Sequence, residues 1–144
     1  MSVQSIFTRM RRRSGGRLLI LGYERVEADP PNRPATAPPA GAGIDLGEFR
    51  WQMEQIAARF EPVTLARLRA HLGGKNPLSG PQICVSFQSE SPVNLRTAFP
   101  LLRQLKLPAT LFAAFECVRD SGSAGAAGGP ECLDWAAMRE LAAQ

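Results

Sequence analysis

The sequence of 144 residues contains a single histidine, His71, and three cysteines without the spacing of a metal site. These shortages argue against a zinc centre built from histidine and cysteine, and against a disulfide framework. We interpret Cys84, Cys117 and Cys132 as reduced thiols. His71 lies in a predicted helix, and we interpret it as a helix-surface residue.

Long apolar runs are also lacking. The run at residues 18–21 ends at Gly22, so it is too short for the core of a signal peptide or for a membrane span. No glycine-rich phosphate loop with its lysine is present, which argues against nucleotide binding. We therefore predict a cytoplasmic protein without a membrane span.

Positive charge is concentrated at the amino terminus. The net charge is +4, and the cluster responsible for much of it consists of Arg9, Arg11, Arg12, Arg13 and Arg17. Clusters of this kind contact nucleic acid or anionic lipid in some proteins, but a solvated leader is the more common explanation. We predict a disordered basic leader at 1–16, one domain at 17–144, and no nucleic-acid partner.

Hydrophobic periodicity predicts alternating strands and helices. Predicted strands lie at residues 18–23, 63–64, 83–87 and 110–115. One helix carries a core-facing stripe, and its members are Leu46, Phe49, Met53, Ile56 and Phe60. Further helices are predicted at 65–72, with Thr64 as N-cap, at 92–106, and after Asp134, also an N-cap. This alternation is typical of an α/β protein with a mostly parallel sheet and flanking helices.

The segment 83–95, ICVSFQSESPVNL, is the most informative part of the chain. An apolar strand is followed by a turn and by a helix that begins near Ser91 and Pro92. Gln88, Ser89 and Glu90 therefore lie at the carboxyl end of a strand, where α/β proteins place their functional groups.

Separate blocks of the sequence, in the same order, resemble the polysaccharide deacetylases, the NodB-homology family. Residues 86–95 are similar to its motif T-F-D-D-G-Y-x-x-N-L, residues 107–112 to P-A-T-F-F, and residues 23–26, YERV, to Y-H-R-V. Residues 49–65 resemble its first helix and short second strand. The resemblance covers about residues 18–141 and implies a partial (β/α) barrel, because a complete one needs roughly 200 residues or more. On this basis the chain is expected to be a truncated domain of this type.

The resemblance implies a metal-dependent hydrolase of N-acetyl groups on glycans, but the catalytic positions differ. The first motif Asp, the general base, corresponds to Gln88, and the second, a ligand of a divalent metal such as zinc, corresponds to Ser89. An amide does not accept a proton near neutral pH, and a neutral hydroxyl is a poor metal ligand. The family's two metal-binding histidines have no counterpart. We predict no intact catalytic or metal site and no bound cofactor, with Glu24, Glu90 and Ser91 facing any substrate.

Three functional hypotheses follow. The first is a truncated, catalytically inactive deacetylase-like protein. The second is a non-catalytic module that binds a glycan or a partner, in which Trp51 or Trp135 stacks on a sugar, although both residues fit helix faces better. The third is an active hydrolase that uses Glu24 or Glu90 as base, but such a site lacks the electrophile that amide hydrolysis needs. The expected partners are an N-acetylated glycan and a second copy, or another chain, that completes the sheet beside residues 110–115.

Overall fold

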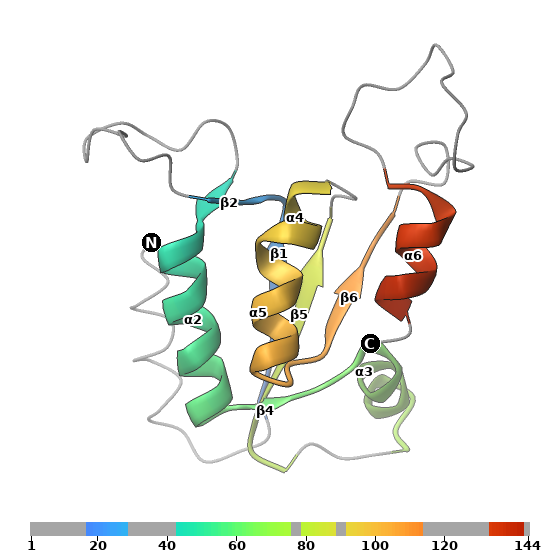
Figure 1. Cartoon of the computed structure of the whole chain (residues 1–144). Helices are drawn as coiled ribbons and strands as arrows, with labels where there is room; N and C mark the ends of the chain where they lie inside the picture. The colour runs from blue at the N-terminus through green and yellow to red at the C-terminus, as the bar shows by residue number, and fades with distance from the viewer. Residues whose placement is uncertain (1–16, 29–42, 76–78, 89–91, 114–132, 143–144) are drawn as a thin grey trace.

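The computed structural model describes residues 17–28, 43–75, 79–88, 92–113 and 133–142. The predicted leader, the positions Ser89, Glu90 and Ser91, and Cys117 and Cys132 lie outside the described residues. In chain order the elements are β1 (Arg17–Tyr23), β2 (Val26–Glu27), β3 (Ile44–Asp45), α2 (Leu46–Arg59), β4 (Glu61–Pro62), α3 (Leu65–Leu72), β5 (Pro81–Phe87), α4 (Pro92–Arg96), α5 (Ala98–Gln104), β6 (Ala109–Leu111) and α6 (Trp135–Ala142) (Figure 1).

Strand β5 is the centre of the main sheet. Strand β1 pairs with it along its whole length, from Arg17 opposite Pro81 to Tyr23 opposite Phe87. The other side of β5 is shared, because β4 pairs with its beginning and β6 with its end. All of these pairings are parallel, as is the separate pair of β2 and β3. The predicted α/β class with a mostly parallel sheet is confirmed.

Helices α2 and α5 cover one face of the sheet, and the hydrophobic core lies between these helices and the sheet (Figure 1). Ile83, Val85 and Phe87 of β5 point into this core because alternate strand residues face the same side. An aromatic cluster surrounds Phe87, the last residue of β5. The centroid of the Phe87 ring lies 5.2 Å from that of Phe99 and 6.1 Å from that of Phe49. This packing joins α2, α5 and β5 into one unit.

Helix α2 forms as its periodicity predicts. Phe49, Met53 and Ile56 are fully buried, and Leu46 and Phe60 pack against them. The helix begins at Asp45, whose carboxylate accepts a 2.7 Å hydrogen bond from the backbone N–H of Glu48. The sequence did not predict this cap, but two caps that it predicted are confirmed: Thr64 accepts from the N–H of Arg67, and Asp134 from that of Ala137.

The structure corrects three predicted boundaries. The predicted single helix at 92–106 is two helices, α4 and α5, separated at Thr97. Pro100 explains the break, because it lacks an N–H and its ring crowds the carbonyl of Arg96. The predicted strand at 110–115 is wrong in extent, since β6 covers only Ala109–Leu111 and residues 112–113 are not strand. The short second strand lies at Glu61–Pro62 rather than at 63–64.

The second face of β5 is buried as well, but it is more polar. Gln82, Cys84 and Ser86 lie on this face, and each is at most 3% exposed. Cys84 is a free thiol, as predicted, and burial raises its pKa, with a weaker opposing effect from a hydrogen bond with Thr110. Cys84 therefore stays protonated and is not a reactive nucleophile.

Candidate functional site

The carboxyl ends of β1, β5 and β6 meet at one edge of the sheet. The backbone N–H of Gln88 donates a 2.8 Å hydrogen bond to the carbonyl of Tyr23, and that of Phe112 donates one of the same length to Phe87. Glu24, Gln88 and Phe112 thus follow three adjacent strands, and we call this region the strand mouth. It is the edge at which α/β sheets bind ligands.

Gln88, which the motif resemblance aligns with a catalytic base, is exposed at the strand mouth. Its side chain lies over Gly22 of β1, where an added Cβ would be 3.1 Å from the amide Nε2. A larger residue at position 22 would push the Gln88 side chain away. The sequence predicted Gln88 at the end of a strand, but only the pairing of β1 with β5 reveals this contact.

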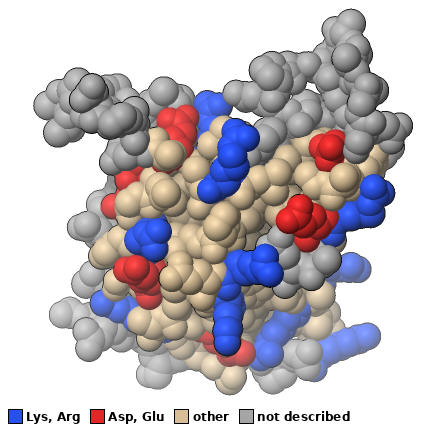
Figure 2. Space-filling model, in the orientation of Figure 1, with Lys and Arg blue, Asp and Glu red and all other residues tan. Residues whose placement is uncertain are grey.

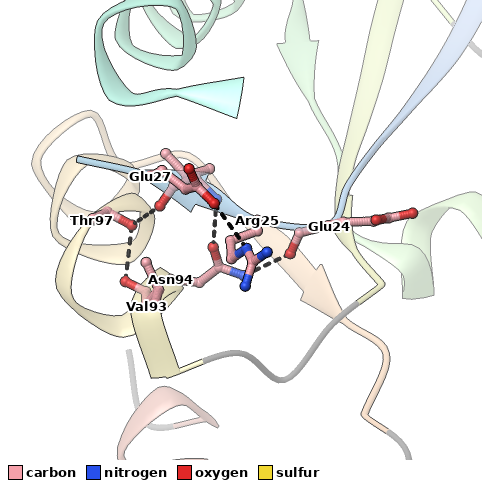
Figure 3. Close-up of polar contacts among 7 residues, drawn as sticks. Glu24, Arg25, Glu27, Val93, Asn94 and Thr97 are labelled. Carbon is pink, nitrogen blue, oxygen red and sulfur yellow. Dashed lines mark hydrogen bonds and ion pairs between the residues drawn. The ribbon is translucent and has the colours of Figure 1, made fainter. Parts of the chain in front are cut away.

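Asn94 holds the turn between β1 and β2 in place, and Figure 3 shows the arrangement. Its Oδ1 accepts a 2.9 Å hydrogen bond from the N–H of Val26, and its Nδ2 donates one of 2.9 Å to the carbonyl of Glu24. Asn94 is fully buried, and its bond to Val26 is buried as well, while its bond to Glu24 is part-buried. The motif asparagine therefore fixes the backbone that carries Glu24.

Thr97 and an ion pair strengthen the same turn. The Thr97 hydroxyl lies 2.6 Å from the carbonyl oxygen of Val26, and it also lies within hydrogen-bonding distance of the carbonyl of Val93. Arg25 Nε lies 3.1 Å from Glu27 Oε1. The side chain of Glu24 points away from this cluster in Figure 3, and it is exposed. Glu24 thus presents a carboxylate on a rigid backbone.

Tyr23 anchors the end of β1 beneath the strand mouth. Its hydroxyl donates a 2.6 Å hydrogen bond to Gln52 Oε1, and Gln52 Nε2 donates one of 2.9 Å to Glu48. Burial, followed by the nearby negative charge of Glu48, raises the pKa of Tyr23 far above its usual range. The hydroxyl stays protonated and acts as a structural donor.

The described donors do not fit the divalent metal that the motif resemblance implies. Within the described ranges, no group of three or more His, Cys, Asp or Glu side chains is placed to hold a metal ion. The position that the resemblance aligns with a metal-binding carboxylate is Ser89, which lies outside the described residues and whose neutral hydroxyl is a poor metal ligand. His71 belongs to α3, which lies toward the end of the sheet where β5 begins, opposite the strand mouth (Figure 1). It is half-buried there and does not join the candidate residues.

The two tryptophans lie on helices, as the sequence indicated. Trp51 packs against the core from α2, and Trp135 begins α6 with 37% of its surface exposed.

The sequence did not predict the structural roles of Asn94 and Gln52. In each case the sequence shows a polar residue on an otherwise apolar helix face, but this pattern does not identify its hydrogen-bond partner.

No described helix is long and apolar enough to cross a membrane.

Comparison with known proteins gives matches among solved structures alone. No protein-family model matches the sequence, and no curated protein matches it. IcaB from Ammonifex degensii is 24% identical, with a TM-score of 0.67 over 90% of this chain and 50% of that one. The Streptococcus pyogenes deacetylase PplD, solved with acetate, is 16% identical, with a TM-score of 0.69 over 90% of this chain and 54% of that one. A de-N-acetylase from Aggregatibacter actinomycetemcomitans is 14% identical, with a TM-score of 0.67 over 88% of this chain and 50% of that one.

These similarities confirm the predicted fold class, a mixed α/β architecture with a mostly parallel sheet and flanking helices, as in these deacetylase structures. The chain spans about half the length of these structures. About 90% of this chain therefore aligns with part of each of these structures.

Proposed function

We propose that this chain is a deacetylase-like protein that does not itself hydrolyse N-acetyl groups. The observation that carries the proposal is the placement of Gln88, whose exposed amide lies at the end of β5 in the position that the motif assigns to the general base. An amide cannot take up a proton from an attacking water near neutral pH. The fold similarity to deacetylases supports the family-like architecture.

Glu24 does not restore the missing chemistry. It is a carboxylate at the strand mouth, but amide hydrolysis also needs an electrophile that stabilises the oxyanion. The described residues near Glu24 are engaged in holding the β1–β2 turn, with Arg25 paired to Glu27. An alternative hydrolase based on Glu24 is therefore disfavoured.

The strand mouth remains suited to binding a polar ligand. Gln88 offers two N–H donors and a carbonyl acceptor, and Glu24 offers acceptors for sugar hydroxyls. Both side chains are exposed, while Asn94 and Gly22 fix the backbone and the contact surface beneath them. A non-catalytic site for an N-acetylated glycan is the second candidate function.

One experiment tests both statements. The chain is incubated with a tetramer of N-acetylglucosamine and zinc, and acetate release is measured beside calorimetric binding of the same tetramer. We expect no acetate above background, even after the double change Gln88→Asp and Ser89→Asp, because a metal site would still lack its imidazole ligands. We expect weak binding that falls about tenfold or more in Gln88→Ala, since the mutation removes the amide from the strand mouth.

The control for Gln88→Ala is Gln104→Ala, an exposed amide on α5 that lies away from the strand mouth. Chelator-sensitive acetate release by the unmodified chain would refute the inactive assignment. Equal binding of the tetramer by the Gln88 and Gln104 variants would refute the glycan site but not the proposed lack of hydrolysis.

A partner-binding role is supported by the outer strands of the described part of the sheet. Among the described strands, none pairs with the outer side of β1 or of β6. Ile20 on β1 is 56% exposed, and Phe112 just after β6 is 51% exposed. Unpaired strand edges beside apolar side chains favour association with another chain.

We accordingly expect the isolated chain to self-associate through these edges. Multi-angle light scattering should give a mass above that of the monomer, and Phe112→Lys should shift it toward the monomer, because a charge on an edge opposes pairing. Leu72→Lys is the matched control, since Leu72 on α3 is 75% exposed and lies outside the sheet. A monodisperse wild-type monomer would contradict this expectation.

A further inference from the structure

An apolar groove of about 650 Å³ runs between α5 and α6 and is separate from the strand mouth. Its floor is the start of β6 and the turn before it, and its walls are one face of each helix. The lining side chains include Phe99 and Arg103 of α5, Lys106 after it, Leu111 of β6, and Met138 and Leu141 of α6.

The two ends of the groove differ in character. Helix α5 and strand β6 run in opposite directions (Figure 1), so Phe99 and Leu111 lie at one end, while Arg103 and Lys106 lie at the other. Arg103 and Lys106 are exposed, and no carboxylate is among the lining residues. Figure 2 shows basic side chains on the lower part of the same face, with some acidic side chains among them. The groove is therefore apolar along its length and cationic at one end.

We propose that this groove binds a single-chain anionic amphiphile, a fatty carboxylate, with its head between Arg103 and Lys106 and its tail toward Phe99. Charge complementarity selects the head, because guanidinium and ammonium groups both pair with carboxylates. The α5 face from Phe99 to the end of the helix at Gln104 is about 7.5 Å long at the helical rise, so a tail of about eight to ten carbons covers its whole length.

An acyl chain fits these walls better than a peptide does. An extended peptide would have to bury backbone N–H and C=O groups against side chains such as Leu102, Leu107 and Met138, which offer no hydrogen-bond partner. An alkyl tail has no such groups, and its burial is favourable in proportion to its apolar area. The volume also lies within the range of small-ligand sites. This site is independent of the glycan function proposed for the strand mouth.

The test is calorimetric titration of the whole chain with sodium decanoate below its critical micelle concentration. We expect saturable binding with one ligand per chain, weakened about tenfold with octanoate, because each methylene contributes about 0.8 kcal/mol of transfer free energy. The double change Arg103→Ala and Lys106→Ala should weaken decanoate binding by tenfold or more. The matched control, Arg96→Ala with Lys75→Ala, removes two exposed cations that do not line the groove and should leave affinity unchanged.

Two further measurements do not use the double variant. Decyltrimethylammonium should bind at least tenfold more weakly than decanoate to the unmodified chain, and Leu141→Glu should abolish decanoate binding while circular dichroism stays unchanged. Equal affinity for the cationic and anionic amphiphiles would overturn the assignment of the head site. Absence of saturable decanoate binding to the unmodified chain would overturn the proposal as a whole.

Discussion

Replacing Phe87 with alanine is expected to lower the free energy of unfolding by about 3–5 kcal/mol, a large part of the stability of a typical domain. Phe87 is fully buried at the end of the central strand. Its ring lies 5.8 Å from Tyr23, 6.1 Å from Phe49 and 5.2 Å from Phe99, so truncation leaves a cavity that rings from three other elements border. Urea unfolding, followed by circular dichroism at one fixed protein concentration, measures the change.

The control is Leu72→Ala. Leu72 is an apolar residue on α3, outside the sheet, and it is 75% exposed, so its loss should change the free energy of unfolding by about 0.5 kcal/mol or less. A cost below about 1 kcal/mol for Phe87→Ala would mean that the aromatic cluster does not hold α2, α5 and β5 together.

Asn94→Leu is expected to cost about 3 kcal/mol and to weaken any ligand binding at the strand mouth. Leucine keeps the approximate volume but leaves the N–H of Val26 and the carbonyl of Glu24 without their partner, and unpaired buried groups cost about 1–3 kcal/mol each. The β1–β2 turn should then become mobile, and Glu24 should lose its fixed position. Thermal unfolding and hydrogen exchange at the backbone N–H of Val26 report these two effects.

Two comparison variants separate this effect from a general cost of removing polar groups. Gln104→Leu changes an exposed amide on α5 and should be close to neutral. Thr97→Val removes a single hydroxyl bonded to the same turn and should cost about 1 kcal/mol. If Asn94→Leu were no more destabilising than Thr97→Val, the two hydrogen bonds of Asn94 would not be the main support of the turn.

Local patterns in the sequence were sufficient for most elements. The stripe of α2, the apolar run of β5, and the caps Thr64 and Asp134 depend on residues close together in the chain, so periodicity and capping rules identify them. The order of the motif blocks also predicted the deacetylase-type fold, which the solved structures confirm. The placement of Gln88 at the end of a strand follows from the same local reasoning.

The strand mouth itself depends on contacts between distant residues. Asn94 bonds to Glu24 and Val26, which lie about seventy positions earlier, and Gln88 meets Gly22 only because β1 and β5 are parallel and in register. The helix breaks at Thr97 because Pro100 opposes a continuous helix, and hydrophobic periodicity does not detect such a break.

The sequence by itself thus determined most element types, the order of the motif blocks and the presence of an amide rather than a carboxylate at position 88, because these depend on residue chemistry and short-range spacing. Tertiary structure alone decided which strand lies beside which, what Asn94 holds, and that α5 and α6 leave an apolar groove with a cationic end. Strand order and hydrogen-bond partners depend on how the chain closes long loops around a shared core, and no local pattern encodes the outcome.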